Sequence, residues 1–263
     1  MTPPPMSELF RVFGRIGLLS FGGPAAQIAL MHRELVETRT WMDEDAFLRA
    51  LSLCMLLPGP EAMQLATYAG WRLRGTAGGL LAGLLFVLPG AMVIAILVAL
   101  YVRFGQLEPV QAAFLGVKAA VIVIVLQALL KVARKALTRR SAWAVAGISF
   151  VAIFALGLPF PLIIAAAALC GVFTAPPATS APPIPSRKSN TLATVAVWGG
   201  LWLVPLAAMT LTGASFLADV GWFFARLAVV TFGGAYAVLG YMTQTVVQDM
   251  GWITTAQMID ALG

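Results

Sequence analysis

Two short glycine- and proline-containing segments combine residue types that suit the binding of an anion. Residues 21–24 (Phe-Gly-Gly-Pro) and 57–60 (Leu-Pro-Gly-Pro) each interrupt an apolar stretch. Because proline is favoured at the first position of a helix, we expect new helices to begin near Pro24 and Pro60. A helix start presents N–H groups without intrahelical acceptors and a partial positive charge, which attracts anions. The alternative is that the glycines only allow a kink or close packing. The residues that we expect to contact an anion here are Gly22, Gly23, Pro24 and Gly59.

Three cations are candidates for neutralising such an anion. Lys118 lies in an otherwise apolar stretch, about twelve residues or roughly 18 Å from its basic end at Lys131. An ionisable group at that depth in a membrane predicts a functional site, unless the lysine reaches the surface from a later-starting span. Arg15 and Arg226 occupy matching positions before two Phe-Gly-Gly segments, the second of which contains Gly233 and Gly234. The alternative for Arg15 is that it anchors an amphipathic helix at the headgroups.

Polar residues beside the breaks could bind substrate or carry a proton. Glu61 follows Pro60, so an ionised carboxylate would repel an incoming anion and a protonated one would not; the alternative is that it only complements the helix dipole. Gln64, one turn later, offers a neutral N–H donor. His32 is the sole histidine and is a second candidate for proton transfer. The charged residues that follow it, which we expect to form a solvated helix end, are Arg33, Glu34 and Glu37.

The composition indicates an all-α membrane protein that crosses the bilayer several times. Of 263 residues, 60% are hydrophobic and only 11% are charged, which is more apolar surface than one soluble core could bury. Residues 76–102 are uncharged, and a helix of about that length crosses a hydrocarbon layer of about 30 Å. Further predicted spans are 109–130 and 191–213, and 141–174 is read as two short spans. The first 75 residues are broken by the two segments, so we expect discontinuous or re-entrant helices there.

The chain also repeats itself. Residues 13–23 (FGRIGLLSFGG) recur as 224–234 (FARLAVVTFGG), and the same offset of 211 relates Trp41 to Trp252. A constant offset with rare residue types in register predicts two homologous halves. We expect a first repeat over 1–174, a cytoplasmic Pro/Ser-rich linker over 175–190, and a connecting span with the start of a second repeat over 191–263.

The distribution of basic residues predicts that the two repeats have opposite orientations. Five cations follow the second long span, between Lys131 and Arg140, which places that loop in the cytoplasm. Counting spans from this loop starts the second repeat on the opposite face from the first. Inverted repeats with discontinuous helices are typical of secondary transporters, whose substrate sites lie near the midplane where the repeats meet.

Together these segments resemble the chromate ion transporter family. The resemblance rests on residues 21–24, 53–71 (LCMLLPGPEAMQLATYAGW), 88–90 (Leu-Pro-Gly) and 232–234 (Phe-Gly-Gly). It implies a long-type member with two halves in opposite orientation that exports chromate from the bacterial cytoplasm across the inner membrane. A second-half partner for 57–60 would fall beyond residue 263, so we expect a chain truncated inside its second half.

We therefore predict a secondary transporter for chromate, driven by the proton gradient or the membrane potential. Sulfate has nearly the same shape and charge, so a transporter of sulfate or another anion is an alternative, as is an anion channel. No Gly-x-x-x-x-Gly-Lys, His-Glu-x-x-His or Cys-x-x-Cys motif is present, so we expect no enzyme activity, cofactor or metal. The cations cluster beside the spans, which argues against nucleic-acid binding. Membrane lipids are the expected surroundings.

Small residues predict packing contacts. Gly75, Gly79 and Gly83 recur at a spacing of four, which suits close approach of helices and would also allow a homodimer. Cys54 and Cys170 lie in apolar segments without metal-like spacing, and we expect both to be small core residues.

Overall fold

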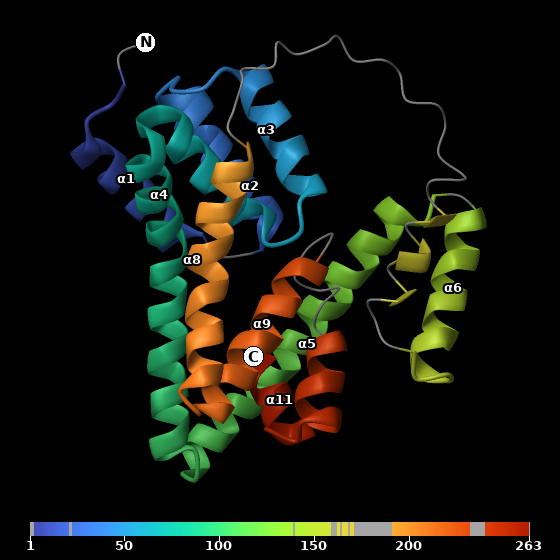
Figure 1. Ribbon diagram of the computed structural model, residues 1–263. Coiled ribbons are helices and arrows are strands. Elements are labelled where there is room, and N and C mark those ends of the chain that lie inside the picture. The colour runs from blue at the N-terminus through green and yellow to red at the C-terminus, as the bar shows by residue number, and fades with distance from the viewer. Residues whose placement is uncertain are drawn as a thin grey trace. The chain divides into compact units, whose positions relative to one another are not determined.

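The computed structural model describes most of the chain as helix (Figure 1). The residues that it describes are 3–20, 23–138, 140–158, 162–163, 165–167, 169–170, 191–231 and 240–262. Their main elements are α1 (Met6–Leu19), α2 (Pro24–His32), η1 (Arg33–Thr38), α3 (Glu44–Leu56), α4 (Glu61–Phe104), α5 (Glu108–Ala136), α6 (Arg140–Phe154), α8 (Thr191–Leu211), α9 (Ser215–Val230), η2 (Gln244–Asp249) and α11 (Thr255–Leu262). This confirms the predicted all-α membrane protein. Contacts divide the chain into one unit of residues 1–130 with 229–263 and a second unit of residues 131–228.

Helices end and begin again at the two glycine- and proline-containing segments, 21–24 and 57–60, as predicted. α1 ends at Leu19 and α2 begins at Pro24, and α3 ends at Leu56 before α4 begins at Glu61. α1 and α3 have 14 and 13 residues, which is short of the roughly 20 residues that a membrane crossing needs.

α4 is a tight pair of antiparallel arms rather than one straight helix. Its backbone leaves helical geometry at Arg74 and Gly75, where Gly75 has a φ of +63°. The arms then meet through small residues: a Cβ on Gly83 would lie 2.7 Å from Thr67 Oγ1, and one on Gly79 would lie 3.0 Å from Trp71 Cβ. The predicted close approach of helices is therefore confirmed at Gly79 and Gly83, within one chain. The prediction for Gly75 is wrong, because Gly75 lies in the turn and a Cβ there would meet nothing within 4 Å.

Two helices among the described residues are long and apolar enough to cross a membrane, α4 and α8. The second arm of α4 contains the predicted span 76–102, and α8 covers most of the predicted span 191–213. The predicted span 109–130 lies within α5, and α6 covers the first part of 141–174. Much of the rest of 141–174, and the linker, lie outside the described residues.

The buried core lies in the first unit, where α1 and α3 pack on α4 (Figure 1). Apolar side chains at helical spacing on α1 supply one face of it. Gly17 lets α1 approach the Leu85 carbonyl of α4 so closely that a Cβ there would overlap it. The largest fully buried side chains are Phe13, Phe47, Leu9, Ile16, Met31, Leu35, Leu65 and Val12. Cys54 is buried as predicted, whereas Cys170 is exposed, so the prediction for Cys170 is wrong.

The same local structure recurs after 211 residues. The π-helix η1 begins at Arg33 and η2 at Gln244. After each, the backbone N–H of a tryptophan donates to the carbonyl of a buried residue: Trp41 to Leu35 at 2.8 Å, and Trp252 to Val246 at 3.0 Å. Both π-helices and both tryptophan hydrogen bonds therefore share the sequence offset.

Candidate functional site

A glutamine bridges the first helix break, which lies between α1 and α2. Gly23 has a φ of +86°, which favours glycine, and Pro24 opens α2. Gln27 on the first turn of α2 donates its side-chain Nε2–H to the Ser20 carbonyl at 3.0 Å, and its backbone N–H bonds Gly23 at 3.1 Å. These bonds fix the end of α1 against the start of α2. Gly22 lies outside the described residues.

A glutamine also bridges the second helix break, which lies between α3 and α4. Gly59 has a φ of +113°, a value that L side chains rarely adopt. Gln64 reaches back from α4 and donates its Nε2–H to the Pro58 carbonyl at 2.6 Å. A Cβ on Gly59 would lie 2.8 Å from that Nε2. Glycine is therefore required here both by backbone geometry and by the glutamine that covers it.

The second break also contacts the other predicted half. The Gly59 N–H donates to the Thr231 carbonyl at 2.8 Å, and Thr231 directly follows α9. Thr231 precedes the second Phe-Gly-Gly, whose Gly233 and Gly234 lie outside the described residues. The structure thus joins the Pro-Gly-Pro segment to the residue that leads into the second Phe-Gly-Gly. No sequence pattern predicted this pairing.

The side-chain oxygen of Gln64 can accept a further hydrogen bond. Its Oε1 is buried and has no partner among the described residues. A buried acceptor without a donor costs about 1–3 kcal/mol. This position therefore favours a neighbour that brings an N–H or O–H group to the break.

Glu61 opens α4 close to the end of α3. Burial raises the pKa of the Cys54 thiol, and the negative charge of Glu61 raises it further. A negative charge at the first turn of a helix interacts favourably with its dipole. The structure therefore places one ionisable carboxyl beside the Pro-Gly-Pro segment.

The prediction that Glu34 lies at a solvated helix end is wrong. Only 3% of Glu34 is exposed. Arg39 pairs with its Oε2, and Arg15 Nη1 lies 3.6 Å from its Oε1. A buried carboxylate needs such partners, since an unpaired one would be strongly disfavoured. Arg33 and Glu37 are exposed, as predicted.

The ion pair with Glu34 orients the side chain of Arg15. Its guanidinium ties α1 to η1, and its side chain is 57% exposed. The residue that matches Glu34 in the second repeat is Thr245, so the second repeat has no carboxylate at the position equivalent to Glu34. Arg226 is exposed on α9 in the second unit. Lys118 lies on α5, and its side chain is outside the described part of the structure.

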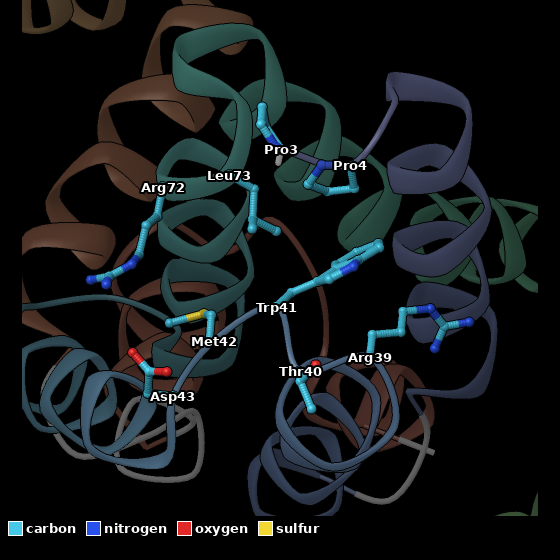
Figure 2. Close-up of a pocket in the computed structure, with 9 residues that line it drawn as sticks. All are labelled: Pro3, Pro4, Arg39, Thr40, Trp41, Met42, Asp43, Arg72 and Leu73. Carbon is cyan, nitrogen blue, oxygen red and sulfur yellow. The ribbon is translucent and has the colours of Figure 1, made fainter. Parts of the chain in front are cut away.

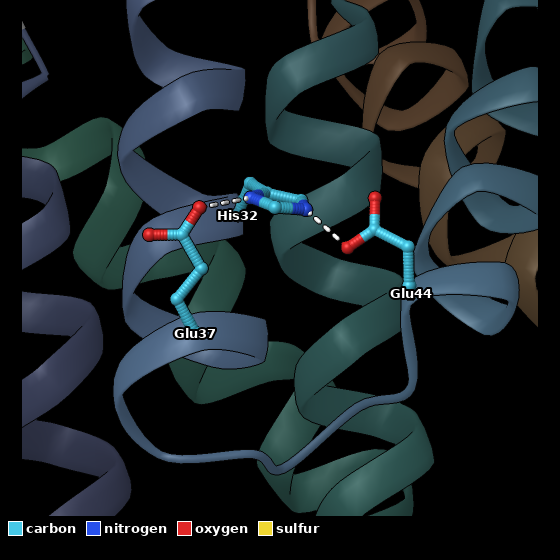
Figure 3. Close-up of polar contacts among 3 residues, drawn as sticks. All are labelled: His32, Glu37 and Glu44. Carbon is cyan, nitrogen blue, oxygen red and sulfur yellow. Dashed lines mark hydrogen bonds and ion pairs between the residues drawn. The ribbon is translucent and has the colours of Figure 1, made fainter.

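His32 is held between two carboxylates (Figure 3). Its Nδ1 lies 3.1 Å from Glu37 Oε1 and its Nε2 lies 2.6 Å from Glu44 Oε2. Its ring also meets the ring of Phe47 edge to face, with centroids 5.2 Å apart. Only the protonated imidazole can donate from both nitrogens at once. Each N–H of a protonated His32 would therefore have its own carboxylate acceptor, and the residue links α2 to the start of α3.

The two arms of α4 form a hairpin, whose tip is the turn at Arg74 and Gly75. A separate cavity of about 520 Å³ lies where residues 39–43 meet this tip of the α4 hairpin (Figure 2). Its polar lining includes Arg39, Asp43 and Arg72. None of the residues predicted from the sequence to bind substrate lines it.

Broken helices that begin at glycine- and proline-containing turns, in a chain with spans long enough to cross a bilayer, define a helical membrane protein with a candidate anion site. The model of the chromate transporter family matches residues 7–172 and 218–263. The chain belongs to the chromate transporter family, whose members are transporters rather than enzymes. The two matched stretches begin 211 residues apart, at the repeat offset.

Curated relatives agree with this assignment. The chain is 35% identical to the chromate transport protein of Pseudomonas aeruginosa, over 99% of this chain and 63% of that protein. It is 34% identical to the probable chromate transport protein of Synechococcus elongatus, over 98% of this chain and 64% of that protein. An uncharacterized transporter of Bacillus subtilis, YwrA, is 35% identical over 45% of this chain and 66% of its own length. The chain thus spans under two thirds of the two chromate transport proteins. No solved structure matches it.

Sequence reasoning missed Glu34, Arg39 and Thr231. The repeat offered a signal for the first two, because Glu34 and Arg39 are both replaced by uncharged residues, Thr245 and Met250, in the second copy. Residues that change together in this way fit an ion pair.

Proposed function

We propose that the chain forms the first half, and the start of the second, of a secondary transporter that exports chromate from the cytoplasm. The observation that carries this proposal is the hydrogen bond from Gly59 to Thr231, which joins the first-half Pro-Gly-Pro to the residue before the second-half Phe-Gly-Gly. Transporters with inverted repeats bind substrate where such breaks meet. The family assignment and the printed names of the relatives support chromate as substrate.

The anion would be held by helix starts and a few cations. Backbone N–H groups at the beginnings of α2 and α4, next to Gly23 and Gly59, are suitable donors for a tetrahedral oxyanion. Gln64 keeps the second break in this conformation. Arg226 and Lys118 are the cations that we propose for charge neutralisation, because Arg15 already shares Glu34 with Arg39.

The proposed topology is multi-pass in the bacterial inner membrane, with the two repeats in opposite orientations. Basic residues at Arg72 and Arg74 precede the long arm of α4 and favour the cytoplasmic side for the hairpin tip. The shared local structure of η1 and η2 supports the homology of the two repeats. Non-helical backbone at membrane depth needs a surrounding of protein or water, which a substrate cavity would supply.

Two groups are proposed to couple transport to protons. Glu61 stands at the Pro-Gly-Pro segment, where its negative charge would oppose a bound anion until it is protonated. A protonated His32 would donate to both Glu37 and Glu44, so loss of that proton would weaken the link between α2 and α3. A proton could thus change both the charge at the site and the packing beside it.

The test is chromate accumulation in a chromate-sensitive bacterium that expresses the full-length protein. The proposal expects lower accumulation than in cells with an empty vector, and a dependence on the imposed pH gradient. Excess sulfate separates the alternatives, since a general oxyanion transporter would lose its effect on chromate. Flux that follows only the electrical gradient would indicate a channel. Unchanged accumulation at good expression would contradict chromate export.

A further inference from the structure

The cavity at the tip of the α4 hairpin includes two side chains, Thr40 and Asp43, that the local backbone does not require. Its most informative lining residues are Arg39, Thr40, Trp41, Asp43 and Arg72 (Figure 2). The loop 39–43 has a counterpart in the second repeat, residues 250–254, which follows the same π-helix and forms the same tryptophan hydrogen bond. Comparing the two loops separates what the backbone needs from what the cavity adds.

Thr40 is the first such addition. It has a φ of +49°, and it is the one residue other than glycine with a positive φ among the described residues. The matching residue in the second repeat is Gly251, with a φ of +61°. A β-branched side chain in this conformation costs on the order of 1–3 kcal/mol. The turn favours glycine, so the threonine hydroxyl is present at a cost in stability.

Asp43 is the second addition. It occupies the N-cap of α3, but its side chain makes no capping hydrogen bond. The matching Thr254 does cap α11: its Oγ1 accepts from the Gln257 N–H at 3.2 Å, and Gln257 Oε1 accepts from the Thr254 N–H at 2.9 Å. The Asp43 carboxylate therefore does not cap α3 as its position allows, and Asp43 lines the cavity.

The charges around the cavity are balanced. Arg39 pairs with the buried Glu34, and its guanidinium lies 5.7 Å from the ring centre of Trp41. Arg72 forms no ion pair with any residue that the structure describes, and Asp43 contributes the opposing charge. A dianion such as chromate would meet little net positive charge here. A ligand with one positive and one negative group fits this balance better.

The cavity also lies at the end of an apolar helix. Arg72 and Leu73 stand just before the hairpin turn that opens the long arm of α4. Tryptophan and arginine are typical of the membrane–water interface, and apolar Leu73 and Met42 line the same cavity. We propose that this cavity binds the headgroup of a zwitterionic phospholipid that carries a primary ammonium, with the phosphate on Arg72 and the Thr40 hydroxyl and the ammonium on Asp43.

Native mass spectrometry of the purified full-length protein tests this proposal. The protein is delipidated in detergent and titrated with phosphatidylethanolamine, phosphatidylcholine, phosphatidylglycerol or inorganic phosphate. We expect one tight site for phosphatidylethanolamine, weaker binding of the other two lipids, and no competition by millimolar phosphate. Arg72→Ala should weaken that site roughly 10-fold or more, as expected for a lost charge-assisted hydrogen bond.

Asp43→Asn gives the sharper result. It should remove the preference for phosphatidylethanolamine over phosphatidylglycerol, while the lipid phosphate still binds Arg72. A merely structural role of Asp43 would not change this ratio. Thr40→Gly adopts a residue that the second repeat already uses in this turn, so it should keep the fold and still weaken binding.

The matched controls are Arg74→Ala and Asp45→Asn, which alter exposed charges of the same kind that do not line the cavity. Both should bind lipid like the parent protein. Equal phosphatidylethanolamine binding in all variants would overturn the proposal. Displacement of the lipid by inorganic phosphate would also overturn it, because the site would then be a simple anion site.

Discussion

Replacing Gly59 with alanine is the most informative single change at the proposed substrate site. The φ of +113° makes any L side chain strained, at about 1–3 kcal/mol. The added Cβ would lie 2.8 Å from Gln64 Nε2, which would displace the hydrogen bond to Pro58 and cost about 1 kcal/mol more. Movement of the turn would also strain the bond to Thr231. We therefore expect Gly59→Ala to lower the free energy of unfolding by about 2–5 kcal/mol.

The assay is unfolding of the purified full-length protein in mixed micelles by sodium dodecyl sulfate, followed by tryptophan fluorescence, beside a measurement of chromate transport. Gly75→Ala is the matched control, since Gly75 also has a positive φ but has open space where a Cβ would stand. It should show the backbone strain alone and keep transport. In the double variant Gly59→Ala/Gln64→Ala the contact with Gln64 is absent, so the two changes should cost less together than their sum.

The reasoning would be refuted if Gly59→Ala were no less stable than Gly75→Ala and transported chromate at the parent rate. Additive effects of the Gly59 and Gln64 changes would show that the glutamine does not cover the turn.

Three further changes test other parts of the structure. In a protein with Cys170 replaced by serine, Glu61→Gln should speed alkylation of Cys54 at pH 8. Removing the negative charge lowers the raised pKa of the Cys54 thiol and so increases the thiolate fraction. An unchanged rate would show that the Glu61 carboxyl is neutral or distant. Gly83→Leu should destabilise the protein by about 1–3 kcal/mol by forcing the arms of α4 apart, whereas Gly90→Leu, where a Cβ meets nothing within 4 Å, should be nearly neutral in the same unfolding assay. His32→Gln should flatten the dependence of chromate transport on pH; a profile identical to that of the parent would limit His32 to a structural role.

The helix breaks could be predicted because they depend on local chemistry. Gly23 with Pro24, and Gly59 with Pro60, restrict the backbone whatever surrounds them, so the sequence alone placed the ends of α1 and α3 within a few residues. The same holds for the spans, whose length and lack of charge are properties of the sequence. The small residues of α4 predicted close packing, but only the turn at Arg74 showed that the partner is the same helix.

The rest depended on contacts between segments that are distant in the sequence. Glu34 looks like a surface residue beside Arg33 and Glu37, and only the positions of α1 and of Arg39 show that it is buried. The bond between Gly59 and Thr231 joins the two predicted halves, and no periodicity reports it. The helix starts of the proposed site therefore follow from local sequence, whereas the contact between its segments follows from tertiary structure.

The central claim is that chromate crosses where the two sets of breaks meet. The most direct measurement is the initial rate of chromate uptake into inside-out membrane vesicles that contain the full-length protein, since uptake there corresponds to export from the cell. The account predicts saturable uptake that Gln64→Ala and Arg226→Ala each reduce at least 10-fold at equal protein level, as expected for about 1.4 kcal/mol or more of lost interaction, while Arg74→Ala leaves it unchanged. Uptake at the parent rate in both site variants would contradict it.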